Sequence, residues 1–453
     1  MSRWESYVRQ VLIGAVLSRV PLVLYVCAWL WRRLLLRTTF VAVSGSLGKT
    51  TTKELLGAVL KEHAPTFRSW RNQNSRSAVA LNILRVRPWH RFAVIEVEGG
   101  APGAMDWPAW FVAPDVTLML CIAPTHTSAY SDLHAHASEL VKIIRHTRPK
   151  GLVLLNADDP RVVRMAAEFS GRKLFFRVAA ETNGIAVETG SPSMPISVLG
   201  KVAGDAWPER LRVAVSVAEP FQPHAVTMDT QLIGAHWAHA VVGVYSAALA
   251  LGVPPERILA SLAKAPPFPG RLYPVTAPNG AVFLRDDYNA SMCVLDASLD
   301  VLRRARAKRR ILVLTDFSDS GANRRKRLRL LTERLAGCAD AFLLIGKESH
   351  YGARMAVQAR LADENVHHFP GLEGAAEFLR TWTSECDLVL VKGRTTDHAA
   401  RIVLAQFTSI GCWRDYCPKR MLCDICWELG SADPKLLQIQ AIPSVAPALP
   451  ADA

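Results

Sequence analysis

Short apolar runs alternate along the chain with longer stretches in which apolar residues have helical spacing. Phe40–Val43 is the first such run, residues 44–48 form a Gly-containing turn, and residues 50–60 have helical spacing. Further strands are predicted, with helical stretches between them, at residues 92–97, 116–122 and 151–155. This alternation is typical of a mostly parallel sheet that helices cover on both faces. We therefore predict an α/β fold.

The pattern changes twice further along the chain. Residues from about 175 to 233 are rich in Val, Thr, Pro and Gly and have no good helical stretch, which indicates an antiparallel section. A helix is predicted at residues 236–251, and Pro266–Gly270 is the best linker signal. After it, a second series of strands is predicted at residues 310–314, 341–345 and 388–391. We therefore predict two large domains, at residues 40–265 and 266–405.

Composition and charge narrow the class of protein. The chain has 453 residues, of which 50% are hydrophobic, and a formal net charge of +14. This excludes a mainly disordered or collagen-like chain. Residues 1–40 hold six Arg and one Glu, and residues 301–330 hold eleven Lys or Arg and two Asp, so two segments carry the whole excess. We interpret the second segment as solvated helix faces and expect no nucleic-acid partner.

The N-terminal segment, residues 1–39, is a separate region. Val11–Trp31 is almost wholly apolar and just long enough to span a bilayer, but Arg19 is costly in lipid and Pro21 would kink a helix. A basic collar follows at Arg32, Arg33 and Arg37. This pattern suits a helix on the cytoplasmic face of a membrane, or one packed on the next domain or a second subunit. With scattered single cysteines and no secretory cleavage site, we expect a cytoplasmic protein, with the inner membrane face as one alternative.

The turn after the first strand carries the clearest chemical signal, Gly45-Ser46-Leu47-Gly48-Lys49 followed by three threonines. A strand that ends in glycines and opens a helix directs backbone N–H groups and the helix dipole at one spot, and these bind phosphate. Lys49 would reach the outer phosphates, and the Thr50 hydroxyl would ligate Mg²⁺. The predicted nucleotide-binding residues of this loop are Gly45, Ser46, Gly48, Lys49, Thr50 and Thr51.

This shortened loop and its threonines resemble the Mur ligase superfamily, the ATP-dependent amide ligases of peptidoglycan precursor synthesis. Among these, the sequence is most similar to the ligases that add D-alanyl-D-alanine to a UDP-muramoyl tripeptide. The resemblance covers about residues 40–405 and implies a central P-loop ATPase domain followed by a Rossmann-like C-terminal domain. Beyond the loop it is carried, in order, by Asn72, Asn74, Glu96, Pro102-Gly103, Ile122–His126, Asn156–Asp159, Gly234–His236, Gly270-Arg271, Asp286–Ala290, Asp316, Gly321 and Lys392–Arg394.

The resemblance also implies a reaction. The ATP γ-phosphate passes to a carboxylate, and an amine attacks the resulting acyl phosphate. Lys49 and the loop would stabilise charge on the transferring phosphoryl group. Thr50 and Glu96 would hold Mg²⁺, and His126 would complete a second metal site.

Three further residues are implied to contact the nucleotide. Asn156 would lie beside the adenine, whereas Arg271 and Asp286 would face the nucleotide from the C-terminal domain, so that catalysis needs domain closure. The implied catalytic residues are Lys49, Glu96, His126 and Arg271.

The sequence departs from this family at three places. The loop begins at Gly45, which leaves no room for the UDP-binding domain that these ligases carry before it, so we expect no UDP-sugar peptide bound in the family manner. Leu140 occupies the position of a family lysine, and Lys142, about 200° away on a helix, cannot replace it. Trp237 and Ala240 stand where the family has asparagines.

A cysteine cluster in residues 406–453 lies outside the family pattern. Four thiols within fifteen residues could close a tetrahedral Zn²⁺ site. An iron–sulfur cluster and four unrelated reduced thiols are the alternatives. The residues are Cys412, Cys417, Cys423 and Cys426.

We therefore expect an ATP- and Mg²⁺-dependent ligase that joins an amino acid or dipeptide to an unidentified carboxylate on a small molecule, peptide or glycan. The alternative is a non-catalytic Mur-like protein that binds nucleotide and a partner at the membrane.

Overall fold

The computed structural model describes residues 21–124, 129–179, 195–318, 324–335, 337–419 and 422–430. Its contacts divide the chain into two units. The central unit comprises the residues up to 203 together with 212–231 and 237–265. The C-terminal unit comprises residues 204–211 and 232–236 and the chain from 266 onward.

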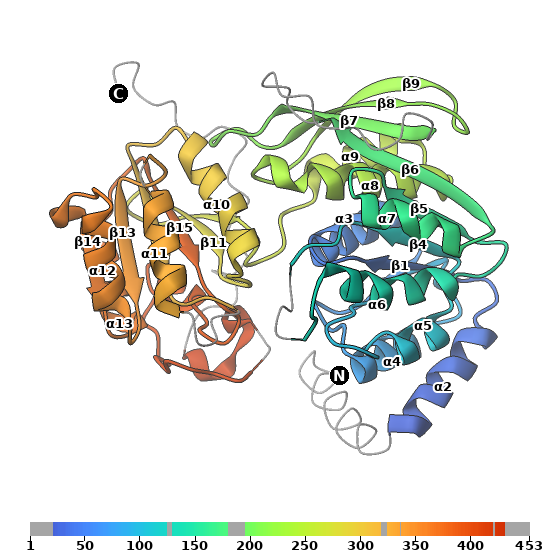
Figure 1. Cartoon of the computed structure of the whole chain (residues 1–453), viewed down its shortest axis with the longest axis horizontal. Coiled ribbons are helices and arrows are strands. Elements are labelled where there is room, and N and C mark those ends of the chain that lie inside the picture. Colours follow the sequence, from blue (N-terminus) through green and yellow to red (C-terminus); the bar gives the residue numbers. More distant parts are fainter. Residues whose placement is uncertain are drawn as a thin grey trace. The chain divides into compact units, whose positions relative to one another are not determined.

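The central unit is built on a nine-stranded sheet (Figure 1). In spatial order its strands are β2 (Thr66–Arg68), β3 (Phe92–Glu96), β1 (Thr39–Ser44), β4 (Val116–Met119), β5 (Leu152–Asn156), β6 (Arg172–Ala179), β7 (Ile196–Gly204), β8 (Arg212–Val217) and β9 (His224–Asp229). From β2 to β7 neighbouring strands pair in parallel, and β8 pairs with β9 antiparallel. The predicted antiparallel section is therefore found at β8–β9, whereas β6 and β7 pair in parallel.

Helices cover both faces of this sheet, as the alternating pattern predicts. One face carries α3 (Lys49–His63), α8 (Ala238–Ala250) and α9 (Pro255–Lys264). The helices α4 (Arg76–Arg85), α5 (Asp106–Val112) and α6 (Leu133–Arg145) cover the other face, and α7 (Pro160–Arg164) follows β5. Strands β1, β3 and β4 are almost fully buried because both of their faces are covered.

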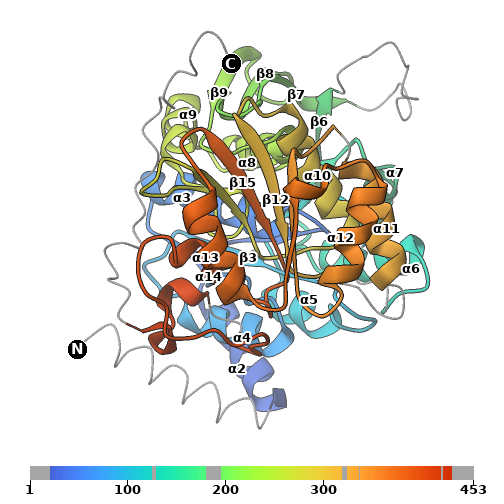
Figure 2. The same ribbon diagram turned by 90° about the vertical axis from the view of Figure 1, so that its left-hand side faces the viewer.

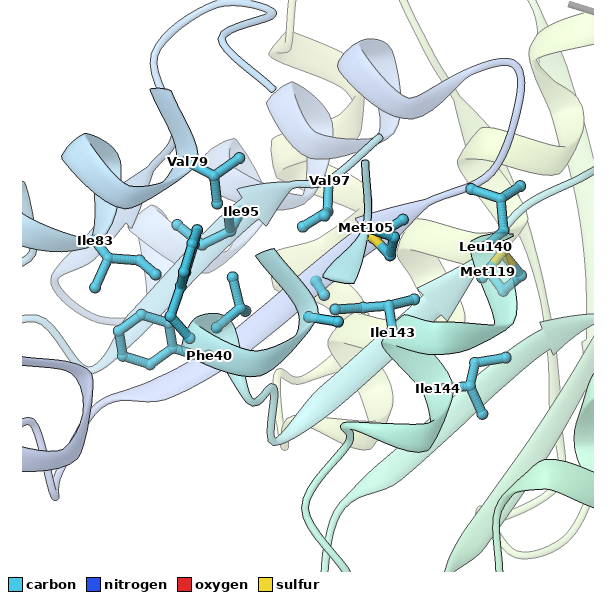
Figure 3. Close-up of a cluster of buried hydrophobic side chains, with 14 of the residues drawn as sticks. Phe40, Val79, Ile83, Ile95, Val97, Met105, Met119, Leu140, Ile143 and Ile144 are labelled. Atoms are coloured by element: carbon cyan, nitrogen blue, oxygen red, sulfur yellow. The ribbon is translucent and has the colours of Figure 1, made fainter. Parts of the chain in front are cut away.

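The apolar N-terminal segment contributes one described helix, α2 (Pro21–Leu34), which packs on α4 and α5. Its inner residues join the cluster of buried apolar side chains beneath α4–α6, part of which Figure 3 shows around Phe40, Val79 and Ile95. In the described part of the chain, no helix is long and apolar enough to cross a membrane. Val11–Val20 lies outside the described residues.

The C-terminal unit is a second α/β layer structure (Figure 2). Its six strands, in spatial order, are β10 (Tyr273–Thr276), β11 (Val282–Asp286), β15 (Asp387–Lys392), β12 (Arg309–Leu314), β13 (Ala341–Ile345) and β14 (Val366–Phe369). Only β10 pairs antiparallel within this set. Its helices are α10 (Met292–Arg304), α11 (Arg324–Leu335), α12 (Ser349–Gln358), α13 (Leu372–Trp382) and α14 (Ala400–Leu404).

Alternation along these strands builds two cores, one on each face of the sheet. On β12, Leu312 and Leu314 join a cluster with α10–α12, whereas Ile311 and Val313 join a cluster with α13 and α14. Successive side chains of a strand point to opposite faces, so a continuous apolar run fills both layers. The predicted α/β fold, with a P-loop unit and a Rossmann-like unit, is confirmed.

Candidate nucleotide and metal site

The turn between β1 and α3 is shaped by its two glycines. Gly45 has φ +132° and Gly48 φ +81°, backbone conformations that glycine adopts at little cost. A Cβ on Gly45 would lie 3.1 Å from the backbone N and O of Cys121, so the loop also passes too close to the end of β4 for a side chain. The helix begins at Lys49, and its first N–H groups have no acceptor within the helix. The loop thus presents donors at a helix N-terminus.

Lys49 folds back over this turn. Its Nζ donates to the carbonyl oxygens of Gly45, at 2.8 Å, and Ser46, at 3.0 Å, and it lies 3.0 Å from Glu98 Oε1. The side chain is almost fully buried. An ammonium held by carbonyls and by one carboxylate at the mouth of the loop is placed to exchange those partners for phosphate oxygens.

Glu96, the last residue of β3, lies beside the start of α3. Its Oε1 accepts from Thr50 Oγ1 at 3.1 Å and from Asn74 Nδ2 at 3.0 Å. The side chain is buried, and burial raises the pKa of Glu96 although the ammonium groups of Lys53 and Lys49 act in the opposite direction. The resemblance implied that Glu96 and Thr50 hold one metal ion, and the structure brings the two side chains together.

Several polar atoms at this site are buried without a partner. Among the described residues, none supplies a hydrogen bond to the second carboxylate oxygen of Glu96 or to the hydroxyls of Ser46, Thr51 and Thr52. Unmet buried polar groups cost free energy, so a cluster of them marks a place where a ligand belongs. Carboxylate and hydroxyl oxygens are what Mg²⁺ prefers, and the loop donors suit a polyphosphate. The residues therefore fit ATP and Mg²⁺.

A buried lysine that sequence reasoning missed supports the same site. Lys53 lies one turn along α3 from Lys49, and its Nζ donates to the carbonyls of Ser69 and Arg71 and pairs with Glu54. Ser69 in turn accepts from the backbone N–H of Glu96 at 3.1 Å. The spacing of Lys53 from Lys49 was the only signal in the sequence, because the two carbonyls that accept from Lys53 lie on another segment.

Asn156 ends β5 and closes its own turn. Its Oδ1 accepts from the N–H of Asp158 at 3.0 Å. Asp159 accepts from the N–H of Ile122 at 2.7 Å and so ties this turn to the segment after β4. The adenine contact of Asn156 stays a prediction, and His126 lies outside the described residues.

The C-terminal unit has its own buried cluster at the carboxyl ends of β11 and β15. Asp286 and Lys392 are register partners and form an ion pair, and Ser298 Oγ donates to Asp286 Oδ2 at 2.6 Å. Burial alone would raise the pKa of Asp286, but the charge of Lys392 and the bonds from Lys392 and Ser298 outweigh it and lower the pKa. Nearby, burial lowers the pKa of His236 to about 4.

Arg271 lies at the start of the C-terminal unit, where Gly270 has φ +81°. Its guanidinium stacks over the ring of Tyr288, 4.7 Å from the centroid. Tyr288 follows Asp286 and Asp287 on the same strand-to-loop junction, so this part of the predicted motif is assembled within one unit.

Comparisons with known proteins agree with this geometry. Residues 43–244 match the Mur ligase middle domain, and residues 270–395 match the Mur ligase, glutamate ligase domain. The UDP-N-acetylmuramoyl-tripeptide–D-alanyl-D-alanine ligase of Escherichia coli K12 is 25% identical over 323 residues, which are 71% of this chain and 67% of that protein.

Solved structures give the same result for the fold. MurF from Acinetobacter baumannii superposes with a TM-score of 0.73 at 22% identity, covering 84% of this chain and 79% of that one. MurF from Thermotoga maritima, solved in complex with ADP, has a TM-score of 0.67 at 21% identity, covering 85% and 83%.

This chain belongs to the Mur ligase family. Its relatives are ATP-dependent ligases that form a carbon–nitrogen bond, and the predicted family, fold and enzyme class are confirmed.

On α6, this Mur ligase carries Leu140 where the resemblance led us to expect a lysine. Leu140 is fully buried and packs near Met119 and Ile143, on the inner face of the helix (Figure 3). Its neighbour Glu139 accepts from the backbone N–H groups of Gly103, at 2.9 Å, and Met105, at 2.7 Å.

Lys142, two residues after Leu140, points elsewhere. Its Nζ lies 2.5 Å from Asp106 and 2.9 Å from Glu139, in a partly exposed ion pair. That Lys142 does not replace a family lysine stays a prediction.

The other departures lie where α8 begins. Trp237 and Ala240 are both buried in this Mur ligase. Apolar packing thus occupies the two positions at which the resemblance led us to expect asparagines.

The cysteine segment of this Mur ligase is tied to the C-terminal unit beyond the matched region. Arg285, itself buried, makes two bonds to Asp424, at 2.5 and 3.0 Å. His398 Nδ1 lies 3.1 Å from the Sγ of Cys423, and its Nε2 lies 3.2 Å from the carbonyl of Cys417.

The predicted zinc site is not supported. The described residues contain no group of three or more His, Cys, Asp or Glu that could hold a metal ion. The four cysteines are free thiols, and Cys417 and Cys423 are buried.

Proposed function

We propose that this Mur ligase activates a carboxylate with ATP and joins it to the amine of an amino acid or dipeptide. The observation that carries the proposal is the buried cluster of Lys49, Thr50 and Glu96 with its unmet oxygens at the start of α3. A carboxylate oxygen attacks the γ-phosphorus of ATP, the bond to ADP breaks, and an acyl phosphate forms. The amine then attacks the acyl carbon, loses a proton, and phosphate leaves.

We assign Lys49 to the transferring phosphoryl group. In the structure its charge is held by two carbonyls and by Glu98, whose side chain is partly exposed. A triphosphate offers stronger acceptors at the same end of the loop, and the lysine would neutralise charge that develops in transfer. Mg²⁺, held by Thr50 and Glu96, supplies charge neutralisation when bound.

A pocket in the C-terminal unit suits a small zwitterion, and we assign the incoming amine to it. The pocket has a volume of about 330 Å³ and lies past the carboxyl ends of β12 and β13. Its walls carry both signs of charge, from Asp316, Arg324, Lys347 and Arg394. Asp316 pairs with Arg324 and, at 3.1 Å, with Arg394, so the guanidinium groups are held in place for a carboxylate.

The relative from E. coli is named for a UDP-muramoyl tripeptide and D-alanyl-D-alanine. We propose an amine substrate of the same class and leave the carboxylate unidentified. ATP supply places the reaction in the cytoplasm, and the basic, apolar N-terminal segment favours its inner membrane face.

A second candidate function is a non-catalytic nucleotide-binding protein. It is favoured by one observation, the burial of Leu140 in the core at the position of a family lysine. The loss of that lysine removes a charge from the metal region and would leave nucleotide binding through the loop intact.

The test is phosphate release from ATP across a panel of acids and amino acids or dipeptides. We expect release that needs both an acid and an amine, and a loss of about 10²–10³-fold in Lys49→Ala. Thr50→Ser, which keeps the hydroxyl, serves as the matched control and retains activity. Tight ATP binding with no turnover on any pair would favour the non-catalytic function, and rapid ATP hydrolysis without either substrate would contradict the ligase.

A further inference from the structure

Helix α2 has two apolar faces, and only one of them is covered. The inner face, with Leu24, Tyr25 and Ala28, is buried against the central unit. The outer face is a row of exposed apolar side chains at helical spacing, formed by Leu22, Val23, Val26, Leu30 and Leu34. Single exposed apolar residues are common, but a continuous row of this kind marks an interaction surface.

The row continues past the end of the helix. Leu34 and Leu36 are 71% and 85% exposed, and Trp89, on the turn between α4 and β3, is 69% exposed. That turn is fastened to the end of α2, because Trp31 Nε1 donates to the carbonyl of Val86 at 2.9 Å. The side chain of Arg91 likewise donates to the carbonyl of Arg37 at 3.0 Å. We call these exposed residues of α2 and the 86–91 turn the α2 surface.

The two segments that form the α2 surface carry only positive charge. Residues 21–48 and 85–95 contain no Asp or Glu. Arg37, Arg87 and Arg91 are exposed beside the apolar row. Arg33 stacks over Trp29, 3.7 Å from the ring centroid, at the same end of the helix.

We propose that the α2 surface docks on an anionic lipid bilayer, with α2 lying in the plane of the headgroups. Apolar side chains with an exposed tryptophan and a basic rim are the combination that an interfacial helix presents to anionic lipid. If a second copy of the chain bound here, the exposed arginines of the two copies would come together, and the repulsion between their charges disfavours such a dimer. The proposal concerns binding alone and does not rest on the ligase reaction.

The anchoring of α2 accounts for the in-plane orientation. Arg32 is buried beneath the helix and donates to the carbonyls of Val112, at 2.8 Å, and Ala113, at 3.0 Å, and to Asp115, at 2.9 Å. A helix held by a buried arginine that is hydrogen-bonded to the unit cannot leave it without exposing that charge to lipid.

The test is sedimentation of the full chain with lipid vesicles. We expect binding to phosphatidylcholine vesicles that contain about one third phosphatidylglycerol, and little to phosphatidylcholine alone. The double variant Leu30→Asp, Leu34→Asp should lower partitioning by about tenfold or more. The matched control is Leu330→Asp, Val357→Asp, which places the same charges at exposed apolar positions on α11 and α12 and should bind normally.

The basic rim is tested separately. Replacing Arg37 and Arg87 by Gln should weaken binding to the anionic vesicles severalfold. It should also flatten the salt dependence between about 0.1 and 1 M, where the Debye length falls from about 10 to 3 Å. Circular dichroism and ATP binding of each variant check that the fold is kept.

Three outcomes would overturn the proposal. One is no binding to either vesicle, and another is binding that the Leu30→Asp, Leu34→Asp variant leaves unchanged. The third is self-association of the chain in light scattering, without binding to vesicles. If the Leu30→Asp, Leu34→Asp variant abolishes this self-association, the α2 surface binds a second copy of the chain.

Discussion

Each unit of this Mur ligase has a buried cluster of a lysine, a carboxylate and a hydroxyl at the carboxyl end of parallel strands. In the central unit these are Lys49, Glu96 and Thr50, and in the C-terminal unit they are Lys392, Asp286 and Ser298. Residue types and strand position are alike. The two clusters differ in how completely their polar atoms are paired.

In the C-terminal cluster the three polar side chains bond to one another, and we call this cluster closed. Lys392 Nζ contacts both Asp286 and Ser298, and Ser298 Oγ also donates to the carboxylate. The net effect lowers the pKa of Asp286, as expected for a carboxylate whose charge is met by its neighbours. Such a cluster stabilises the fold without a ligand.

The central cluster is left open. Lys49 bonds to carbonyls and to Glu98 but not to Glu96, and burial raises the pKa of Glu96. One oxygen of Glu96 and three nearby hydroxyls have no partner among the described residues. The contrast teaches that an incomplete set of bonds, rather than the presence of buried charge, distinguishes a binding site from a structural ion pair.

The largest expected effect is on stability, in the closed cluster. Lys392→Met leaves the Asp286 carboxylate buried without its cation, and we expect a loss of about 3–5 kcal/mol in the free energy of unfolding. Urea unfolding of the full chain measures it. The double variant Lys392→Met, Asp286→Asn removes both charges and should recover at least half of the loss.

Lys49→Met is the matched control for this prediction. It removes an equally buried lysine, but Glu98 keeps a side chain that is 25% exposed and can be hydrated, so we expect a loss of only about 1 kcal/mol. If Lys392→Met and Lys49→Met lower the free energy of unfolding equally, the two clusters contribute to stability in the same way and the contrast between them fails.

The next effect is the pH dependence of metal binding at Glu96. Because its pKa is raised in the folded chain, metal-free stability should fall as pH rises from the ordinary carboxylate pKa through the raised value. Mg²⁺ binds the ionised form, so the stabilisation by Mg²⁺–nucleotide should grow over the same window. Melting temperatures with and without Mg²⁺–nucleotide measure both, and Glu96→Gln should remove the pH dependence. A wild-type response that is flat across this window would count against Glu96 as a ligand.

Local pattern was sufficient for the loop and for several strands, but β2, β10, β11 and β14 were not predicted. The strand Ala341–Ile345 is predicted and found with the same bounds. A short apolar run between turns, in a chain of alternating strands and helices, predicts a buried strand. The resemblance implied that Thr50 and Glu96 hold one metal ion, and the two side chains do meet in the structure.

Contacts between distant segments could not be predicted from local sequence pattern. The bond from Arg285 to Asp424 joins residues 139 positions apart, and the bonds from Glu139 to Gly103 and Met105 join a helix to a loop. Neither periodicity nor spacing encodes which buried carboxylate meets which donor. The closed state of the Asp286 cluster was missed for the same reason: the resemblance assigned Asp286 to the nucleotide without its partner on β15.

The smallest effect concerns Asn74, which we assign as a positioning residue for Glu96. Its Nδ2 donates to Glu96 Oε1 at 3.0 Å and lowers the pKa of that carboxyl, so Asn74→Ala should shift the pH midpoint of Mg²⁺ stabilisation upward. A net loss of about 1 kcal/mol corresponds to roughly fivefold in Mg²⁺–nucleotide affinity. Asn72→Ala, two residues away, is the control and should leave the midpoint where it is. If both variants weaken affinity equally with no movement of the midpoint, the segment acts through its fold and the bond to Glu96 carries no specific role.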